Sequence, residues 1–338
     1  MYQLKQIPED FVVREVTSIV PQTQGKYLYF ILRKRDRNTL DALTQIARVL
    51  GVREKDIGFA GSKDKQAVTE QLISIQGVVK ERVLTIKLRD SSLEFLGYGS
   101  EPISLGDLQG NKFEIIVRNL EQVEIKPVAY VENYFDEQRF SKNNAEIGKY
   151  LVLKKFKEAV GLVDDAHCQD YLQDHPQDFV GALKQIPLRM LRMYVNAFQS
   201  YLWNETLARY LRQQGEVLRE EDYSLGKLVF VKKVDSLLNL EVPILGFGSE
   251  EVKLDPKLRV IADALMQETG IEYHDFIIKQ IPELSLEGEM REAVVAVENF
   301  VLGAVENDEL NSGRNKVKVV FTLPKGSYAT MVIRRVFG

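Results

Sequence analysis

The feature that most constrains the fold is a change of sequence pattern near residue 148. Before it, segments such as 27–35 (YLYFILRKR) are rich in β-branched and aromatic residues, which is typical of strands. After it, residues 188–215 carry apolar residues on a broad helical face that ends at a glycine. At residues 321–337 the sequence becomes strand-like and basic again. A sheet completed by the C-terminus predicts that a helical domain is inserted into a sheet domain.

We therefore expect an α+β fold with a mixed, largely antiparallel sheet. Residues 1–147 and 292–338 would form the sheet domain, and residues 148–291 the helix-rich insertion, whose helices would extend into the acidic region 250–311. Within the first part, apolar residues recur at helical spacing over residues 39–50, which predicts a helix packed on the sheet.

Composition excludes several classes of protein. The 338 residues include one cysteine and three histidines, too few for a disulfide framework or a zinc site, so we expect no metal. No window approaches the length of an apolar membrane span, and the N-terminus lacks the basic and apolar regions of a signal peptide. We expect a cytoplasmic protein with no membrane association and no obligate protein partner.

Charge is segregated along the chain. The formal net charge is −4, but residues 250–311 contain five Lys/Arg and fifteen Asp/Glu, whereas residues 312–338 contain six Lys/Arg and no acid. A second basic cluster, RKRDR, occupies residues 33–37. The two basic clusters predict a positive surface for a phosphate backbone, although segregated charge is also common on ordinary solvated faces.

The turn at residues 58–65 (GFAGSKDK) is the first candidate for chemistry. It is not a P-loop, because two residues rather than four separate its glycines and Ser62 precedes Lys63. A KH-type GXXG loop would join two helices, whereas this turn joins two predicted strands. Asp64 between Lys63 and Lys65 suits an ionised, reactive carboxylate near an RNA backbone. A plain solvated turn remains the alternative from these residues alone.

Five motifs together resemble the TruD family of tRNA pseudouridine synthases. They follow the family's order and extend over almost the whole chain: PEDFVVRE at 8–15, GFAGSKDKQAVTEQ at 58–71, LQGNKF at 108–113, NYFDEQRF at 133–140 and LPKGSYAT at 323–330. The resemblance implies a pseudouridine-synthase core that carries the family's inserted TRUD domain. It also implies a cofactor-independent enzyme that isomerises uridine to pseudouridine in tRNA, most often at position 13, with other structured RNAs as further substrates to consider. An RNA-binding or RNA-folding protein without catalysis is the alternative.

The resemblance also assigns site residues. It implies that Asp64 is the catalytic nucleophile, and that aromatic side chains and an amide hold a uridine flipped out of its stack. The remaining candidates are expected to support the pocket or contact phosphate. The substrate-binding set is Phe11, Glu15, Lys63, Asn133, Phe135, Arg139 and Tyr328, with Lys5 as a further candidate for support. The chain departs from the family pattern where Asp136 and Ser141 replace glycines, which puts the local backbone in question.

Overall fold

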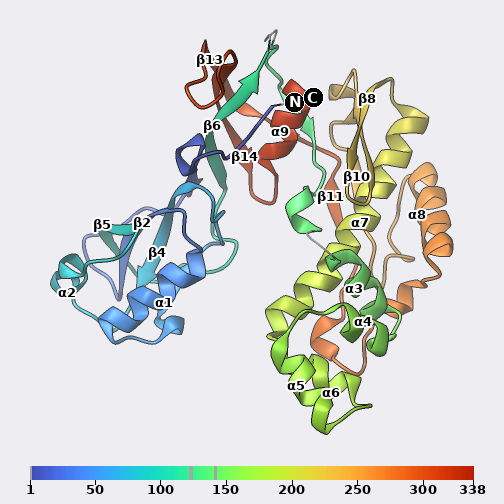
Figure 1. Cartoon of the computed structure of the whole chain (residues 1–338), viewed down its shortest axis with the longest axis horizontal. Coiled ribbons are helices and arrows are strands. Elements are labelled where there is room, and N and C mark those ends of the chain that lie inside the picture. The colour runs from blue at the N-terminus through green and yellow to red at the C-terminus, as the bar shows by residue number, and fades with distance from the viewer. Residues whose placement is uncertain (1, 122–124, 141–142) are drawn as a thin grey trace. The chain divides into compact units, whose positions relative to one another are not determined.

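The chain forms two compact units, each with its own core. The computed structural model describes residues 2–121, 125–140 and 143–338 (Figure 1). Residues 1–129 and 296–337 form the first unit, and residues 130–295 form the second, which is thus inserted into the chain of the first. The domain limits expected from the sequence, 148–291 for the insertion, stay a prediction.

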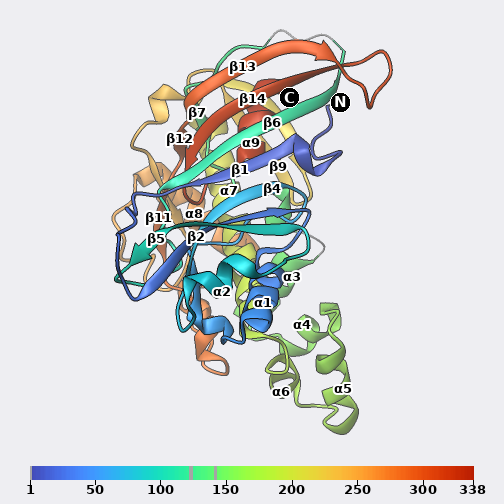
Figure 2. The same cartoon turned by 90° about the vertical axis from the view of Figure 1, so that its left-hand side faces the viewer.

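The first unit is built on an eight-stranded sheet. Its neighbouring strands are antiparallel except for one parallel pair, β1 with β4, which confirms the predicted mixed, largely antiparallel sheet (Figure 2). Seven strands lie side by side in the order β13 (Glu298–Asn307), β14 (Asn315–Pro324), β6 (Gly110–Leu120), β1 (Phe11–Val16), β4 (Val68–Ile75), β2 (Tyr27–Arg35) and β5 (Ser91–Gly99). The eighth strand, β3, pairs with β4.

Two strands share one edge of β4. Strand β1 pairs with its first residues, 68–70, and the short strand β3 (Ile57–Phe59) pairs with its last residues, 73–75. The hairpin from β3 to β4 cannot continue its ladder, because β1 already occupies the edge at that point. The connecting loop, residues 60–67, therefore leaves the sheet where β1 and β3 meet.

Helix α1 (Thr39–Leu50) covers one face of this part of the sheet, as predicted. Its apolar side, including Leu43 and Ile46, packs against alternate residues of β2 such as Phe30 and Leu32. The helix ends at Gly51, whose positive φ of 68° is the left-handed cap that glycine adopts without steric cost. A short helix, α2 (Lys80–Thr85), follows β4.

Two predictions near the C-terminus are wrong. The strand-like sequence 321–337 is a strand only through Pro324 and then forms helix α9 (Ala329–Phe337). Its apolar residues recur at helical spacing, and this outweighs the strand propensity of valine and isoleucine. The acidic region 250–311 contains one α-helix, α8 (Pro256–Thr269), and residues 289–307 near its end form mostly strands instead of helix.

The second unit is organised around the long helix α7 (Leu188–Gln214), which has fourteen buried residues. Gly148 lies where an earlier helix, α3 (Asn144–Val152), packs against α7. An added Cβ at Gly148 would stand 2.1 Å from the carbonyl oxygen of Tyr194, so only glycine permits this approach. Within the described residues no helix is both long and apolar enough to span a membrane. The other elements are α4 (Phe156–Leu162), α5 (Ala166–Asp174), α6 (Phe179–Leu183), β7 (Tyr130–Glu132), β8 (Val217–Tyr223), β9 (Gly226–Val231), β10 (Glu241–Ile244), β11 (Glu289–Glu292) and β12 (Val294–Ala296).

A buried arginine joins three segments of the first unit. Arg118 on β6 is 1% exposed and donates to Asp10 at 2.8 Å and to Asp308 at 2.7 Å, both of which are buried. Its third nitrogen lies 3.0 Å from Glu309. The guanidinium thereby ties the N-terminal segment and the turn after β13 to the middle of the sheet.

We expect Arg118→Met to destabilise the protein strongly. The substitution leaves two buried carboxylates without their cation, and breaking a buried pair in this way costs about 3–5 kcal/mol. Urea denaturation at pH 7 measures the loss. Arg53→Met, which removes an exposed pair with Asp56, is the matched control and should lose little. Equal losses in the two variants would show that the buried network does not hold the unit together.

Candidate active site

The candidate nucleophile lies on the loop that leaves the sheet at the edge of β4. Asp64 is part-exposed, with 26% of its side chain accessible, and one carboxylate oxygen accepts a hydrogen bond from the Lys5 ammonium at 2.9 Å. Lys5 adopts a positive φ of 56°, which is uncommon for lysine, and its ammonium also stands 4.1 Å above the ring of Phe11. The carboxylate is thus held by a cation that lies 59 residues earlier in the chain.

Lys63 points away from Asp64, contrary to the sequence interpretation that the adjacent lysines flank the carboxylate. Its ammonium lies 2.7 Å from Glu15, and the two side chains are only 5% and 2% exposed. Glu15 also accepts a hydrogen bond from the backbone N–H of Leu72 on β4. Lys63 therefore turns into the protein, whereas the Asp64 side chain is partly exposed. Lys65 is exposed.

Side chains from two neighbouring elements hold the loop. Thr39, at the start of α1, accepts a hydrogen bond from the N–H of Lys63 at 3.0 Å. Gln71 on β4 donates to the carbonyl of Gly61 at 3.0 Å and is itself bonded to Thr39. Nothing lies within 4 Å of the position that a Cβ would take at Gly61. The conformation of the loop therefore comes from these hydrogen bonds rather than from crowding around Gly61.

Several residues of the two basic clusters, which the sequence predicts to form a positive surface, are paired with acidic side chains. In the first, Arg33 lies 3.2 Å from Glu70, Arg35 lies 2.6 Å from Glu9, and Lys34 is buried. Basic residues of β14 are paired in the same way, in the ion pairs Lys316–Glu309 and Lys318–Glu114. Acidic partners from neighbouring strands neutralise much of this charge, which linear charge counting does not detect.

The aromatic candidates of the first unit differ in exposure. Phe11 is 2% exposed and packs edge-on against Phe113, so its ring belongs to the core apart from its contact with Lys5. Tyr328 is half-buried in the turn between β14 and α9, and its carbonyl accepts the N–H of Met331. Of the two, Tyr328 is therefore the more accessible for stacking on a base.

The remaining candidates gather in the second unit. Phe135 is half-buried and packs edge-on against the buried Trp203, and the guanidinium of Arg291 lies 4.3 Å from its ring centre. Asn133 accepts from Arg291 at 2.7 Å and donates to the backbone carbonyl of Glu292 at 3.1 Å, so its amide is engaged within the protein. Arg139 stands 5.8 Å from the Phe135 ring and donates to Ser200. The guanidinium groups of Arg291 and Arg139 thus lie near the half-buried ring of Phe135.

The replacement of a family glycine by Asp136 requires no unusual backbone. Asp136 has a φ of −84° and a ψ of 164°, an extended conformation open to any residue, and it is 8% exposed. The short 3-10 turn Glu137–Arg139 follows it. Ser141, the second such replacement, lies outside the described residues.

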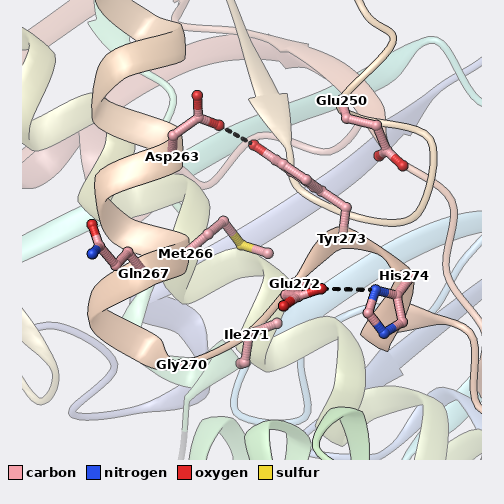
Figure 3. Close-up of a pocket in the computed structure, with 9 residues that line it drawn as sticks. All are labelled: Glu250, Asp263, Met266, Gln267, Gly270, Ile271, Glu272, Tyr273 and His274. Carbon is pink, nitrogen blue, oxygen red and sulfur yellow. Dashed lines mark hydrogen bonds and ion pairs between the residues drawn. The ribbon is translucent and has the colours of Figure 1, made fainter.

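A separate cavity of about 640 Å³ lies in the second unit, beside α8 and the segment after it (Figure 3). Tyr273 donates to Asp263 at 2.9 Å, and burial together with this bond raises the pKa of Tyr273 to about 12. Across the cavity His274 lies 3.1 Å from Glu272 (Figure 3). None of the nine lining residues is a site residue predicted from the sequence.

Comparison with known proteins identifies the class of enzyme. A family model described as tRNA pseudouridine synthase D (TruD) matches residues 2–169 and 164–336. The Aquifex aeolicus protein named tRNA pseudouridine synthase D is 29% identical, covering 99% of this chain and 98% of that protein. The Methanosarcina mazei protein named Probable tRNA pseudouridine synthase D is 30% identical, covering 98% of this chain and 92% of that protein.

A solved structure agrees with these relatives. A crystal structure assigned to tRNA pseudouridine synthase D (TruD) from Methanosarcina mazei superposes with a TM-score of 0.68 and 28% identity, covering 99% of this chain and 93% of that one. The fold and the matches together define a pseudouridine synthase, an enzyme of the isomerase class. Within that class, the chain belongs to the TruD family.

Sequence reasoning missed part of this arrangement. Nothing in the sequence points to Arg291, which contacts both Phe135 and Asn133, because it lies 158 residues from Asn133 and in no motif. Lys5 was considered only as general support. Its position six residues before Phe11 carries no local signal for contact with Asp64, because that contact depends on how β1 and β4 pair.

We expect Glu15 and Lys63 to be strongly coupled. Glu15→Gln or Lys63→Met alone leaves one buried charge unpaired, and each should lower the free energy of unfolding by about 3–5 kcal/mol. Urea denaturation at pH 7 of both single variants and the double variant measures the coupling. The double variant should lose clearly less than the two single losses combined. Strictly additive losses would contradict a direct buried pair.

Proposed function

We propose that this enzyme converts uridine to pseudouridine in tRNA, at position 13, with Asp64 as its nucleophile. The observation that carries the proposal is the state of Asp64, a part-exposed carboxylate oriented by Lys5 at 2.9 Å on a loop that is anchored on both sides. The names of the relatives supply the substrate class. Position 13 comes from the family resemblance of the motifs.

The reaction is an isomerisation of one nucleoside. The N1–C1′ bond breaks, the uracil ring turns, and a C5–C1′ bond forms. The hydrogen on C5 leaves as a proton, and N1 takes up a proton. A carboxylate can assist by attacking C1′ of the sugar or by adding to C6 of the ring. The accessible Asp64 carboxylate suits either role, and its ion pair with Lys5 holds it in one position.

A uridine inside a folded tRNA must leave its stack before a side chain can reach it, and flipped bases are usually held by aromatic stacking and edge hydrogen bonds. Phe135 supports such a role because its ring is accessible and because Arg291 and Arg139 place positive charge beside it. Tyr328 is the corresponding ring in the first unit. Asn133 would bind a base edge by exchanging one of its present hydrogen bonds.

The first test uses the hydrogen that leaves C5. An unmodified tRNA transcript carrying [5-³H]uridine should release tritium to water with the wild type and not with Asp64→Asn, because the amide is neutral and a poor nucleophile. Binding of the transcript should survive. Asp41→Asn, which changes an exposed aspartate on α1, is the matched control and should keep full activity. Release by Asp64→Asn at the wild-type rate would overturn the assignment of the nucleophile.

The second test addresses the position of the target. Replacing U13 of the transcript by cytidine should remove the tritium release, because a cytidine there offers no uridine to isomerise. Replacing another loop uridine should leave one equivalent of release intact. If the U13→C transcript still releases tritium, the target uridine lies elsewhere in the tRNA. A loss of tritium release in the Asp64→Asn variant would still identify Asp64 as the nucleophile.

A further inference from the structure

Lys34 is a buried lysine whose place in the fold calls for an explanation. It continues the row of alternate residues on β2, after Phe30 and Leu32, that faces the apolar core beneath α1. The residue is 2% exposed, although a lysine at the end of a strand can usually reach water. Within the described part of the chain it forms no ion pair. Burial of an unpaired ammonium is costly, so packing alone does not account for this residue.

The Lys34 ammonium instead bonds to the backbone of the loop that carries the nucleophile. Its Nζ donates to the carbonyl oxygen of Asp64 at 2.7 Å, and it lies 3.4 Å from the carbonyl oxygen of Lys63. These two peptide groups flank the Cα of Asp64. Their orientation decides that the Asp64 side chain turns toward Lys5 while the Lys63 side chain turns toward Glu15.

This contact complements the other anchors of the loop. Thr39 holds the N–H of Lys63 and Gln71 holds the carbonyl of Gly61, but neither reaches the peptide group that follows Asp64. Lys34 is the group that does. A charged donor makes stronger hydrogen bonds than a neutral one, and low accessibility strengthens them further.

We propose that Lys34 is a positioning residue of this enzyme, whose buried, protonated ammonium clamps the backbone on both sides of Asp64 and keeps the carboxylate in its reactive position. The proposal rests on Asp64 being the nucleophile, as proposed above. It assigns no contact between Lys34 and the substrate. It predicts that the rate of the reaction, rather than the binding of tRNA, depends on the charge of Lys34.

The charge of Lys34 is sensitive to pH. Burial lowers its pKa from the usual range to about 8, the Asp64 carboxylate acts in the opposite direction, and the Lys63 ammonium adds to the lowering. Opposite Lys34 on the neighbouring strands stand Thr69 of β4 and Ser91 of β5, which do not titrate in this range. As the pH rises through about 8, the ammonium loses a proton, the charge-assisted bonds weaken, and the loop is less firmly held.

The test is a single-turnover tritium-release assay at saturating enzyme from pH 6.5 to 10. If the protonated form of Lys34 is required, the wild-type rate at pH 9 should be about tenfold below the rate at pH 7. Lys34→Arg keeps its charge throughout and should lack this alkaline decline. Because both proteins share every other titrating group, including the uridine, the difference isolates Lys34.

Lys34→Met tests the clamp directly. It should react about 100-fold more slowly at every pH, as expected for a displaced reacting group, with unchanged affinity for the transcript. Lys87→Met, which removes an exposed lysine, is the matched control. Limited trypsin digestion gives a readout without catalysis: cleavage after the exposed Lys65 should be faster in folded Lys34→Met than in the wild type or the control.

The outcomes separate this inference from the proposed function. A wild-type alkaline decline that persists unchanged in Lys34→Arg, or a Lys34→Met rate within threefold of wild type, would overturn the role of Lys34 while leaving Asp64 as nucleophile. If the wild type releases no tritium, or if Asp64→Asn releases it at the full rate, the proposed function fails instead. In that case an unchanged digestion rate in Lys34→Met would also refute the clamp.

Discussion

The sharing of one edge of β4 by two strands is the constraint on which the candidate active site depends. Strand β1 pairs with the first residues of β4, and β3 pairs with the last, so the loop between β3 and β4 must leave the sheet between them. A hairpin with a free edge would bury the same residues in a regular ladder. Here the occupied edge places Asp64 on an irregular but anchored loop, which is where reactive side chains are commonly found.

Three lysines around this loop have three different surroundings. Lys5 is partly exposed and bonds the Asp64 carboxylate, Lys63 is buried against Glu15, and Lys34 is buried against backbone carbonyls. The partly exposed cation can exchange its partner for a substrate, whereas the two buried cations are held in place by Glu15 and by backbone carbonyls. Accessibility therefore separates the cation next to the candidate carboxylate from the two that support the loop.

In the second unit, one half-buried aromatic ring is held in place by its neighbours. Phe135 is supported on one side by Trp203 and faced by Arg291, which in turn bonds Asn133. An aromatic ring fixed between a buried indole and a guanidinium keeps its orientation without being buried itself. The same guanidinium adds positive charge, which favours a polyanionic substrate, even though the acidic partners of the basic clusters neutralise much of the charge elsewhere.

The sequence by itself determined the strands of the first unit between residues 10 and 120, helix α1, the long helix α7, and the family through its five motifs. Periodicity and motif order are local properties, so they can be read without the fold. Local propensity failed at residues 329–337 and in the acidic region, where strand-forming and acidic residues occur in both helices and strands. Only the tertiary structure decided which cation pairs with Asp64, that Lys63 and Lys34 are buried, and that Arg291 contacts Phe135. These contacts join residues that are far apart in the chain. Strand pairing and side-chain burial bring such residues together, and neither can be inferred from a single segment of the sequence.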